Sequence, residues 1–238
     1  MLMKYARDDD RETRREAYTQ LGLGLQAHAA ELDDIFDRLV HIRDRIARKM
    51  GYENFVELGY YRMGRLCYNQ DDVAAFRQNI LRDIVPVVTR IRTENAEKMG
   101  IDQFKVYDYD VAVPGGDPRP CVDKDGIFAA AREMYHAMSP ESAAFIDMML
   151  ANDAFDVDSR QNKWGGGYCT EFPNFKQPFI LANFNGTADD VDVVTHEAGH
   201  AFNAYLIADN DYAIELSCGG METAETHSMS MEFFAWPY

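Results

Sequence analysis

Apolar residues recur at three- and four-residue steps through most of the first half of the chain, which is the spacing of one face of an α-helix. The longest such stretch runs from Asp8 to about Lys49, and Gly51 follows it as a residue type that commonly ends helices. The regularly spaced apolar positions within it are Ala17, Leu21, Leu25, Leu32, Ile35, Leu39, Ile42 and Ile46. The pattern predicts long amphipathic helices here.

A second long helix is expected over Asp71–Met99. Its interior Pro86 has no backbone N–H to donate, so the sequence predicts a kink or a break at that point. The stretch Ile101–Asp123 is rich in proline and glycine and is expected to be an irregular connection. Shorter helices are predicted over Asn54–Leu66, Asp125–Met138 and Pro140–Asn152.

Strand-like patterning is confined to Phe155–Asn185. Within it, Gly165–Thr170 and Phe179–Phe184 are expected to pair as a small antiparallel sheet beside the next helix. That helix is predicted to start at Ala188, and a further helix covers Met221–Trp236. The expected fold class is therefore mainly α, with a small antiparallel β element next to one of the helices.

The helix after the strands carries the string His196-Glu197-Ala198-Gly199-His200, an H-E-x-x-H signature. Residues four apart lie about 40° apart around a helix, so His196 and His200 can direct both imidazoles at one metal ion. Glu197 lies about 100° round from His196, near such a metal without being an obvious ligand. A carboxylate in that place suits the general base of a metal-dependent hydrolase.

The surroundings of the string favour a metal site over the alternative, an acidic helix that carries two surface histidines. Thr187 and Asp190 have the spacing of a capping box at the predicted start of this helix. Apolar residues occupy most of its sides: Ala198, Ala201, Phe202, Tyr205, Leu206 and Ile207. The helix is therefore expected to be buried, and two imidazoles and a carboxylate are costly there unless a dication satisfies them.

A catalytic zinc ion takes three protein ligands, so the string leaves one ligand to find. A histidine six residues after His200 would indicate a metzincin, but Leu206 stands there and excludes that class. Glutamates of the Met221–Trp236 helix are the next candidates, although a solvated acidic face is the alternative interpretation for each of them. By spacing alone the candidates are Glu215, Glu222, Glu225, His227 and Glu232, and Glu225 and His227 cannot both face the same ion.

The string Thr195–His200, the 29-residue step from His196 to Glu225, and the segment Glu225–Glu232 together resemble the M3 family of zinc oligopeptidases, most closely its oligoendopeptidase F branch. The resemblance implies a zincin-like helical metallopeptidase fold that holds one zinc ion per chain. It implies that His196, His200 and Glu225 bind the zinc ion, that Glu197 is the catalytic base, and that Glu232 orients a histidine ligand. Gly199 matches a glycine of the family motif and would let another backbone approach closely.

The resemblance extends, less specifically, over residues 155–238, which it implies to be the zinc-binding catalytic core. Residues 1–154 would be a helical region that forms one wall of a substrate channel. Gly165, Gly166 and Gly167 would form a strand edge that binds an extended peptide, and the alternative is a tight turn that needs glycine dihedrals. Family members are much longer, so further N- and C-terminal segments of the same architecture are expected, including the groups that stabilise the oxyanion.

Composition narrows the possible partners. The 238 residues are 47% hydrophobic and 27% charged, with a formal net charge of −16. An acidic chain without a basic patch is unsuited to nucleic acid or to anionic membranes, and no apolar run is long enough to span a bilayer. The four cysteines are far apart and form no C-x-x-C pair, which favours a reducing, cytoplasmic setting.

The sequence therefore predicts a zinc-dependent metalloendopeptidase that hydrolyses short peptides, with Glu197 as the base. Two alternatives remain open. One is a peptidyl-dipeptidase or carboxypeptidase of a related glutamate-zinc family. The other is a catalytically incomplete helical binding domain.

Overall fold

The computed structural model describes residues 3–111, 113–114, 116, 118–208 and 219–238. The chain divides into two compact units, Met1–Asp117 and Pro118–Tyr238. The predicted functional division at residue 154 is a different kind of boundary and stays a prediction. Within the described residues, no helix combines the length and the apolar character needed to cross a bilayer.

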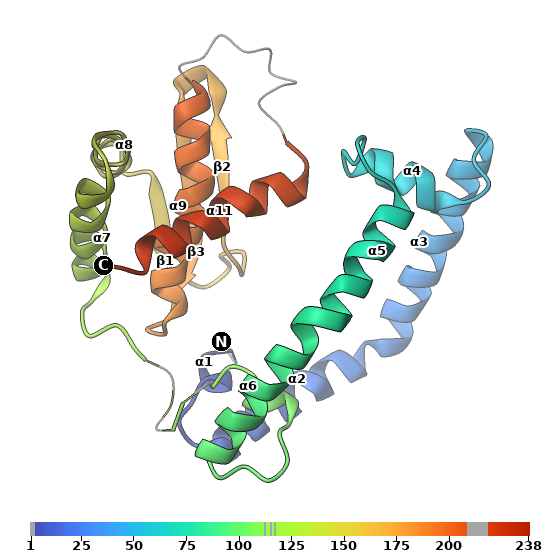
Figure 1. Ribbon diagram of the computed structural model, residues 1–238, viewed down its shortest axis with the longest axis horizontal. Coiled ribbons are helices and arrows are strands. Elements are labelled where there is room, and N and C mark those ends of the chain that lie inside the picture. Colours follow the sequence, from blue (N-terminus) through green and yellow to red (C-terminus); the bar gives the residue numbers. More distant parts are fainter. Residues whose placement is uncertain (1–2, 112, 115, 117, 209–218) are drawn as a thin grey trace. The chain divides into compact units, whose positions relative to one another are not determined.

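The first unit is helical, as its periodicity predicts (Figure 1). Its elements are α1 (Met3–Ala6), α2 (Arg11–Ala27), α3 (Ala29–Lys49), α4 (Phe55–Arg62), α5 (Gln70–Asn79), a π-helical turn (Ile80–Ile84), α6 (Val85–Lys98) and a 3₁₀ turn (Val106–Asp108). The long apolar stretch is two helices rather than one, because His28 leaves helical geometry at φ −112° and ψ 8°. The helix predicted at Asp71 begins one residue earlier, after an Asn69–Asp72 capping box.

Pro86 changes the hydrogen bonding of its helix without ending it. The helical path continues from α5 into α6 through the π turn, in which the Val85 N–H donates to the Ile80 carbonyl. A π turn widens the helix by one residue, so the chain can pass the proline ring that an α-helical turn would exclude. Pro86 itself lies in the first turn of α6, where its missing N–H costs little.

A buried ion cluster joins the two ends of the first unit. Asp108 is fully buried and accepts hydrogen bonds from Arg11 Nε at 2.9 Å and from Arg14 Nη2 at 3.1 Å. Arg14, only 3% exposed, also donates to the backbone carbonyls of Tyr107 and Asp8. Burial alone would raise the pKa of Asp108, but the two guanidinium groups and the Lys105 N–H outweigh burial and lower that pKa. The cluster therefore fixes the start of α2 against the 3₁₀ turn.

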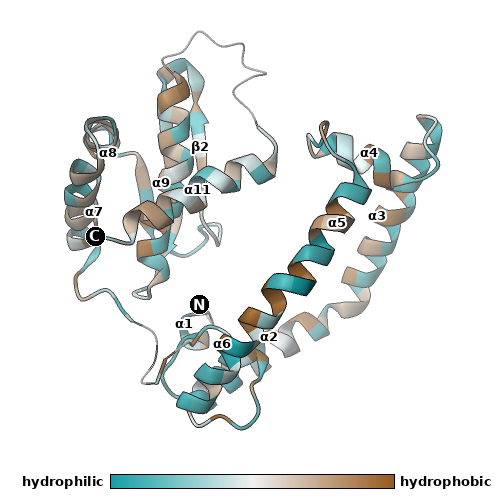
Figure 2. Ribbon diagram, in the orientation of Figure 1, coloured by the Kyte–Doolittle hydropathy of each residue, from teal (hydrophilic) through white to brown (hydrophobic). Residues whose placement is uncertain are grey.

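Several helices of the first unit carry exposed apolar side chains. Figure 2 shows apolar positions alternating with polar ones along α5. On α3 the exposed apolar residues are Leu32, Ile35, Phe36, Leu39, Val40, Ile42 and Ile46, and on α6 they are Val85, Val87, Val88 and Ile91.

The second unit contains a three-stranded sheet with helices packed against it (Figure 1). Its elements are α7 (Lys124–Met138), α8 (Pro140–Ala151), β1 (Phe155–Asp158), β2 (Tyr168–Phe172), a 3₁₀ turn (Pro173–Phe175), β3 (Gln177–Phe184), α9 (Asp189–Ala208) and α11 (Met221–Ala235). The strand order is β1-β3-β2. The core lies between the sheet and the helices, with Tyr135, Phe145, Ile146 and Ile180 fully buried.

The predicted antiparallel pairing is confirmed, since β2 pairs with β3 from Tyr168 opposite Leu181 to Phe172 opposite Gln177. The sheet as a whole is mixed, because β1 adds a parallel pairing to β3 with a register shift between Asp156 and Asp158. The three glycines Gly165–Gly167 precede β2 rather than form its first residues. Alternate β3 residues Pro178, Ile180 and Ala182 are buried, as expected for a sheet with one face on the core.

We expect Asp108→Asn to lower the free energy of unfolding of the first unit by about 3 kcal/mol, because the buried Arg14 guanidinium and the partly exposed Arg11 guanidinium lose their counter-charge. The folded pKa of Asp108 is lowered, so its stabilising contribution is present above the unfolded value near 3.8 and is lost as pH falls through the folded value. Urea unfolding at several pH values measures both effects. Asp83→Asn, at an exposed carboxylate paired with Arg82, is the control and should change stability little.

Candidate metal centre

The start of α9 is held by a network around a buried carboxylate. Asp190 is 4% exposed and accepts hydrogen bonds from the backbone N–H groups of Asn185 and Gly186, both at 2.8 Å. The helix begins at Asp189, one residue after the predicted start. The predicted capping box would pair Asp190 with Thr187, but the Asp190 carboxylate binds the backbone of the preceding loop instead. This network orients α9 relative to the end of β3.

Three side chains from α9 and α11 converge. Glu225 Oε2 lies 3.3 Å from His196 Nε2 and 3.9 Å from His200 Nε2. One potential ligand atom of each residue lies within 4.8 Å of those of the other two, and among the described residues no other group of histidines, cysteines and carboxylates meets this criterion. Two imidazole nitrogens and a carboxylate oxygen bound to one zinc ion would be about 3.4 Å apart. The residues present therefore fit a zinc ion.

The three side chains are also open to solvent, with exposed fractions of 28% for His196, 20% for His200 and 48% for Glu225. A catalytic metal needs a position for water or substrate besides its protein ligands, and this exposure is compatible with one. Of the other candidate ligands, Glu222 and His227 lie outside the three-residue group, and Glu215 lies outside the described residues.

Glu232 contacts the His196 ring on the side opposite Glu225. Its Oε1 is 2.5 Å from His196 Nδ1, on the opposite side of the ring from the nitrogen that faces Glu225. A proton on Nδ1 leaves the Nε2 lone pair free for a metal, so this contact selects the tautomer that a ligand requires. Ser228 contacts Glu225, because its hydroxyl lies within hydrogen-bond distance of Glu225 Oε2, at 3.2 Å, and of the Glu225 backbone carbonyl, at 3.1 Å. Ser228 belongs to the Glu225–Glu232 segment that carries the resemblance, but no role was predicted for it.

Close contact between the two helices makes this convergence possible. A Cβ atom on Gly199 would lie 2.6 Å from Ser228 Cα, closer than a side chain can approach backbone, and 3.0 Å from the His227 carbonyl oxygen. The prediction that Gly199 allows another backbone to approach is confirmed. Ser228 is itself fully buried at this contact.

Glu197 faces the sheet rather than α11. It is half-buried, and burial raises the pKa of its carboxyl, as does the nearby Glu225, whereas His196 and the backbone N–H of Cys169 act to lower it. A Cβ on Gly167 would be 3.5 Å from Glu197 Oε1, so the glycine segment that precedes β2 passes beside this carboxylate.

Two further groups lie close to the site. Burial lowers the pKa of His200, which favours the neutral imidazole that can bind a metal. Burial and Glu197 together raise the pKa of the Cys169 thiol to about 12, so the thiol stays protonated and acts as a small packing residue. Cys218 lies outside the described residues.

Comparison with known proteins found a matching family model and several similar solved structures. The model of peptidase family M3 matches residues 3–113 and 131–238. Among solved structures, PZ peptidase A with a bound inhibitor is 41% identical with a TM-score of 0.94, and a Bacillus anthracis protein provisionally named oligoendopeptidase F is 43% identical with a TM-score of 0.93. Each match covers 99% of this chain but only 42% and 43% of the other chain, so this chain spans less than half of their length.

A Chlamydophila abortus protein provisionally named a peptidase, at 19% identity and a TM-score of 0.66, shares the fold. Curated proteins gave no match to this chain.

We expect Gly199→Ala to separate α9 from α11 and to cost about 1–3 kcal/mol of stability, because the clash is with backbone. Zinc affinity should fall together with stability, since the added methyl group moves Glu225 away from the histidines. Thermal unfolding and zinc titration measure the two effects. Gly22→Ala, in a helix with nothing within 4 Å of the new methyl group, is the matched control and should stabilise the protein slightly. Unchanged zinc affinity in the Gly199 variant would contradict this account.

Proposed function

This chain belongs to peptidase family M3, and we propose that it carries the metal-binding core of a zinc-dependent endopeptidase that hydrolyses short peptides, as its likeness to oligoendopeptidase F suggests. The observation that carries the proposal is the convergence of His196, His200 and Glu225, with Glu197 adjacent and Glu232 behind His196. Two imidazoles, one carboxylate and a neighbouring free glutamate are the groups that glutamate-zinc peptidases use.

In this proposal His196, His200 and Glu225 hold one zinc ion per chain. When bound, the ion supplies Lewis acidity, which acidifies a water molecule and polarises the scissile carbonyl. Glu197 accepts the proton of the attacking water on its carboxylate and then gives that proton to the leaving amine.

In this proposal, the segment Gly165–Gly167 and strand β2 bind the peptide substrate. In the described sheet β2 pairs only with β3, so its other edge faces away from the sheet. An extended peptide can bind such an edge through backbone hydrogen bonds, which accept many sequences. Gly167 passes close to Glu197, so a peptide bound along this segment would bring a backbone carbonyl near the proposed base.

A reducing cytoplasmic setting and further polypeptide segments complete the proposal. The described cysteines Cys67, Cys121 and Cys169 are free thiols, the form expected in a reducing compartment. The solved relatives are more than twice as long as this chain. Additional segments would supply the groups that stabilise the oxyanion and the remaining walls of a substrate channel.

Two substitutions test the metal and the base separately. Glu225→Ala should abolish stoichiometric zinc binding, measured by elemental analysis after dialysis, because one of three ligands is lost. Glu197→Gln should keep the zinc ion but slow hydrolysis of a quenched short peptide by at least about 100-fold, since an amide cannot accept the proton. Hydrolysis is measured on the full-length protein that contains this chain.

The matched controls are Glu222→Ala, on the same helix as Glu225, and Glu141→Gln, an exposed glutamate on α8. Neither should change zinc content or turnover. Wild-type zinc affinity in Glu225→Ala would refute the ligand assignment, and unchanged hydrolysis in Glu197→Gln would refute the mechanism. Cleavage only at a fixed distance from a free C-terminus would favour a peptidyl-dipeptidase or carboxypeptidase. Zinc binding without any hydrolysis would favour the incomplete binding domain.

Glu232→Gln should weaken zinc binding about 10-fold to 100-fold, because the His196 ring loses the charged partner that orients it and raises its basicity. Competition with a chromophoric chelator measures the change. Glu222→Gln removes the same charge from the first turn of α11 and should leave affinity unaltered. Equal losses in the two variants would indicate a general effect of charge rather than orientation of His196.

A further inference from the structure

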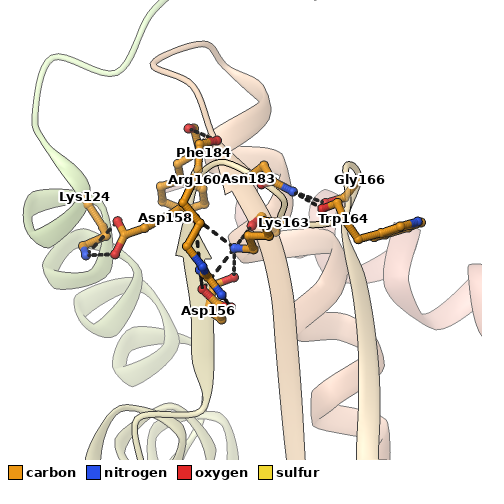
Figure 3. Close-up of polar contacts among 11 residues, drawn as sticks. Lys124, Asp156, Asp158, Arg160, Lys163, Trp164, Gly166, Asn183 and Phe184 are labelled. Atoms are coloured by element: carbon orange, nitrogen blue, oxygen red, sulfur yellow. Dashed lines mark hydrogen bonds and ion pairs between the residues drawn. The ribbon is translucent and has the colours of Figure 1, made fainter. Parts of the chain in front are cut away.

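Lys163 is a buried cation at the end of the sheet (Figure 3). Its side chain is 2% exposed, and its ammonium contacts the carbonyl oxygens of Asp156 at 2.8 Å, Asp158 at 3.0 Å and Ala182 at 2.5 Å. Asp156 Oδ1, at 3.0 Å, balances its charge. These oxygens belong to β1 and β3, at the point where the register of the parallel pair shifts. A buried ammonium is tolerated only when its donors are engaged, so Lys163 has little freedom to move.

The residues before Lys163 are tied to the same two strands. Arg160 forms two hydrogen bonds to the Asp156 carboxylate, at 2.6 and 2.7 Å, and the Ser159 hydroxyl donates to the Phe184 carbonyl. The Arg160 and Lys163 cations hold the pKa of Asp156 well below its usual range. The Asp156 carboxylate therefore stays charged, and Ser159–Lys163 is anchored before the chain reaches the glycines.

Asn183 on β3 fixes the next stretch of chain. Its side-chain Nδ2 donates to the carbonyl oxygens of Trp164 and Gly166, both at 2.9 Å, so both N–H groups of the amide are used (Figure 3). Gly166 has φ +116°, and a Cβ there would lie 2.9 Å from the Trp164 ring. The Trp164 ring in turn packs edge-on against Tyr168, the first residue of β2. The path of the glycine segment is thus set by side chains on both of its flanks.

The glycine segment is held in place although it is exposed. Gly165, Gly166 and Gly167 are exposed, and glycine backbone without side-chain packing is ordinarily free to adopt many conformations. Asn183 and Lys163 hold the segment in one path, and Gly167 at its end lies beside Glu197. A binding edge that is ordered before the peptide arrives loses less entropy on binding.

We propose that Asn183 and Lys163 are positioning residues that hold Gly165–Gly167 in the path required for peptide binding beside Glu197. The inference rests on the proposed peptidase function, because it gives the glycine segment the role of a substrate edge. Neither residue touches the proposed metal ligands, so their effect should fall on peptide affinity and leave zinc affinity intact.

The test compares Asn183→Asp with Asn152→Asp. Aspartate at 183 keeps the shape of asparagine but removes both donors and places a negative charge against two carbonyls. Asn152 bonds to Gln177 at the other end of β3 and is exposed, so its replacement is the matched control. All variants are made in the full-length protein carrying Glu197→Gln, so that a short blocked peptide is bound without being cleaved.

We expect Asn183→Asp to raise the peptide Kd about tenfold, the effect of one to two lost hydrogen bonds, while zinc affinity stays within about twofold. Trp164 provides an independent readout, since the only other tryptophan in this chain is Trp236. With Trp236 and every tryptophan outside this chain replaced by Phe, Trp164 fluorescence anisotropy should fall in Asn183→Asp and stay unchanged in Asn152→Asp. Lys163→Met should act in the same direction as Asn183→Asp, with Lys124→Met, at an exposed lysine paired with Asp158, as its control.

A peptide Kd that stays within twofold in Asn183→Asp overturns the inference, whether or not Trp164 becomes more mobile. An equal loss of affinity in Asn152→Asp overturns it as well, because the effect is then a general one on the sheet. Failure of the parent protein to bind zinc is a different result, which refutes the proposed function itself. Retained zinc binding and folding, with a selective loss of peptide affinity in the Asn183 and Lys163 variants, supports the inference.

Discussion

The contact between the backbones of α9 and α11 sets the geometry of the whole site. Gly199 packs against Ser228 without room for a methyl group, and this distance brings Glu225 to within 3.3–3.9 Å of two imidazoles on the neighbouring helix. The same approach lets Glu232 reach the far side of His196. A single residue without a side chain therefore controls both the ligand atoms and the group that orients one of them.

The sheet, whose strands β2 and β3 directly precede α9 in the chain, adds the other half of the site. Buried β3 residues pack under α9, so the side of α9 that carries Glu197 is turned toward the start of β2. The two faces of α9 thus have different partners. His196 and His200 meet α11, whereas Glu197 meets the glycine segment, and this arrangement separates the groups suited to holding a metal from the group suited to moving a proton.

Local patterns predicted much of this arrangement. The H-E-x-x-H string placed both histidines on one helical face, the helix after it was expected from its own residues, and the antiparallel pairing of β2 with β3 was correct. The parallel pairing of β1 was missed, because a four-residue strand has no periodicity of its own. Lys163 could not be recognised, since a lone lysine in a polar loop ordinarily lies in solvent and its burial depends on three carbonyls from two strands. The choice of Glu225 among several glutamates needed the family resemblance, because spacing alone left the others open.

The three-residue group takes its side chains from two helices, with His196 and His200 on α9 and Glu225 on α11. An ion that bonds to both helices would act as a reversible cross-link, since the unfolded chain has no preformed site to hold it. Its binding energy would then be added to the folding equilibrium in proportion to the logarithm of free zinc. The supply of a trace element would in this way set how long the folded core survives proteolysis in the cell, independently of any catalytic turnover.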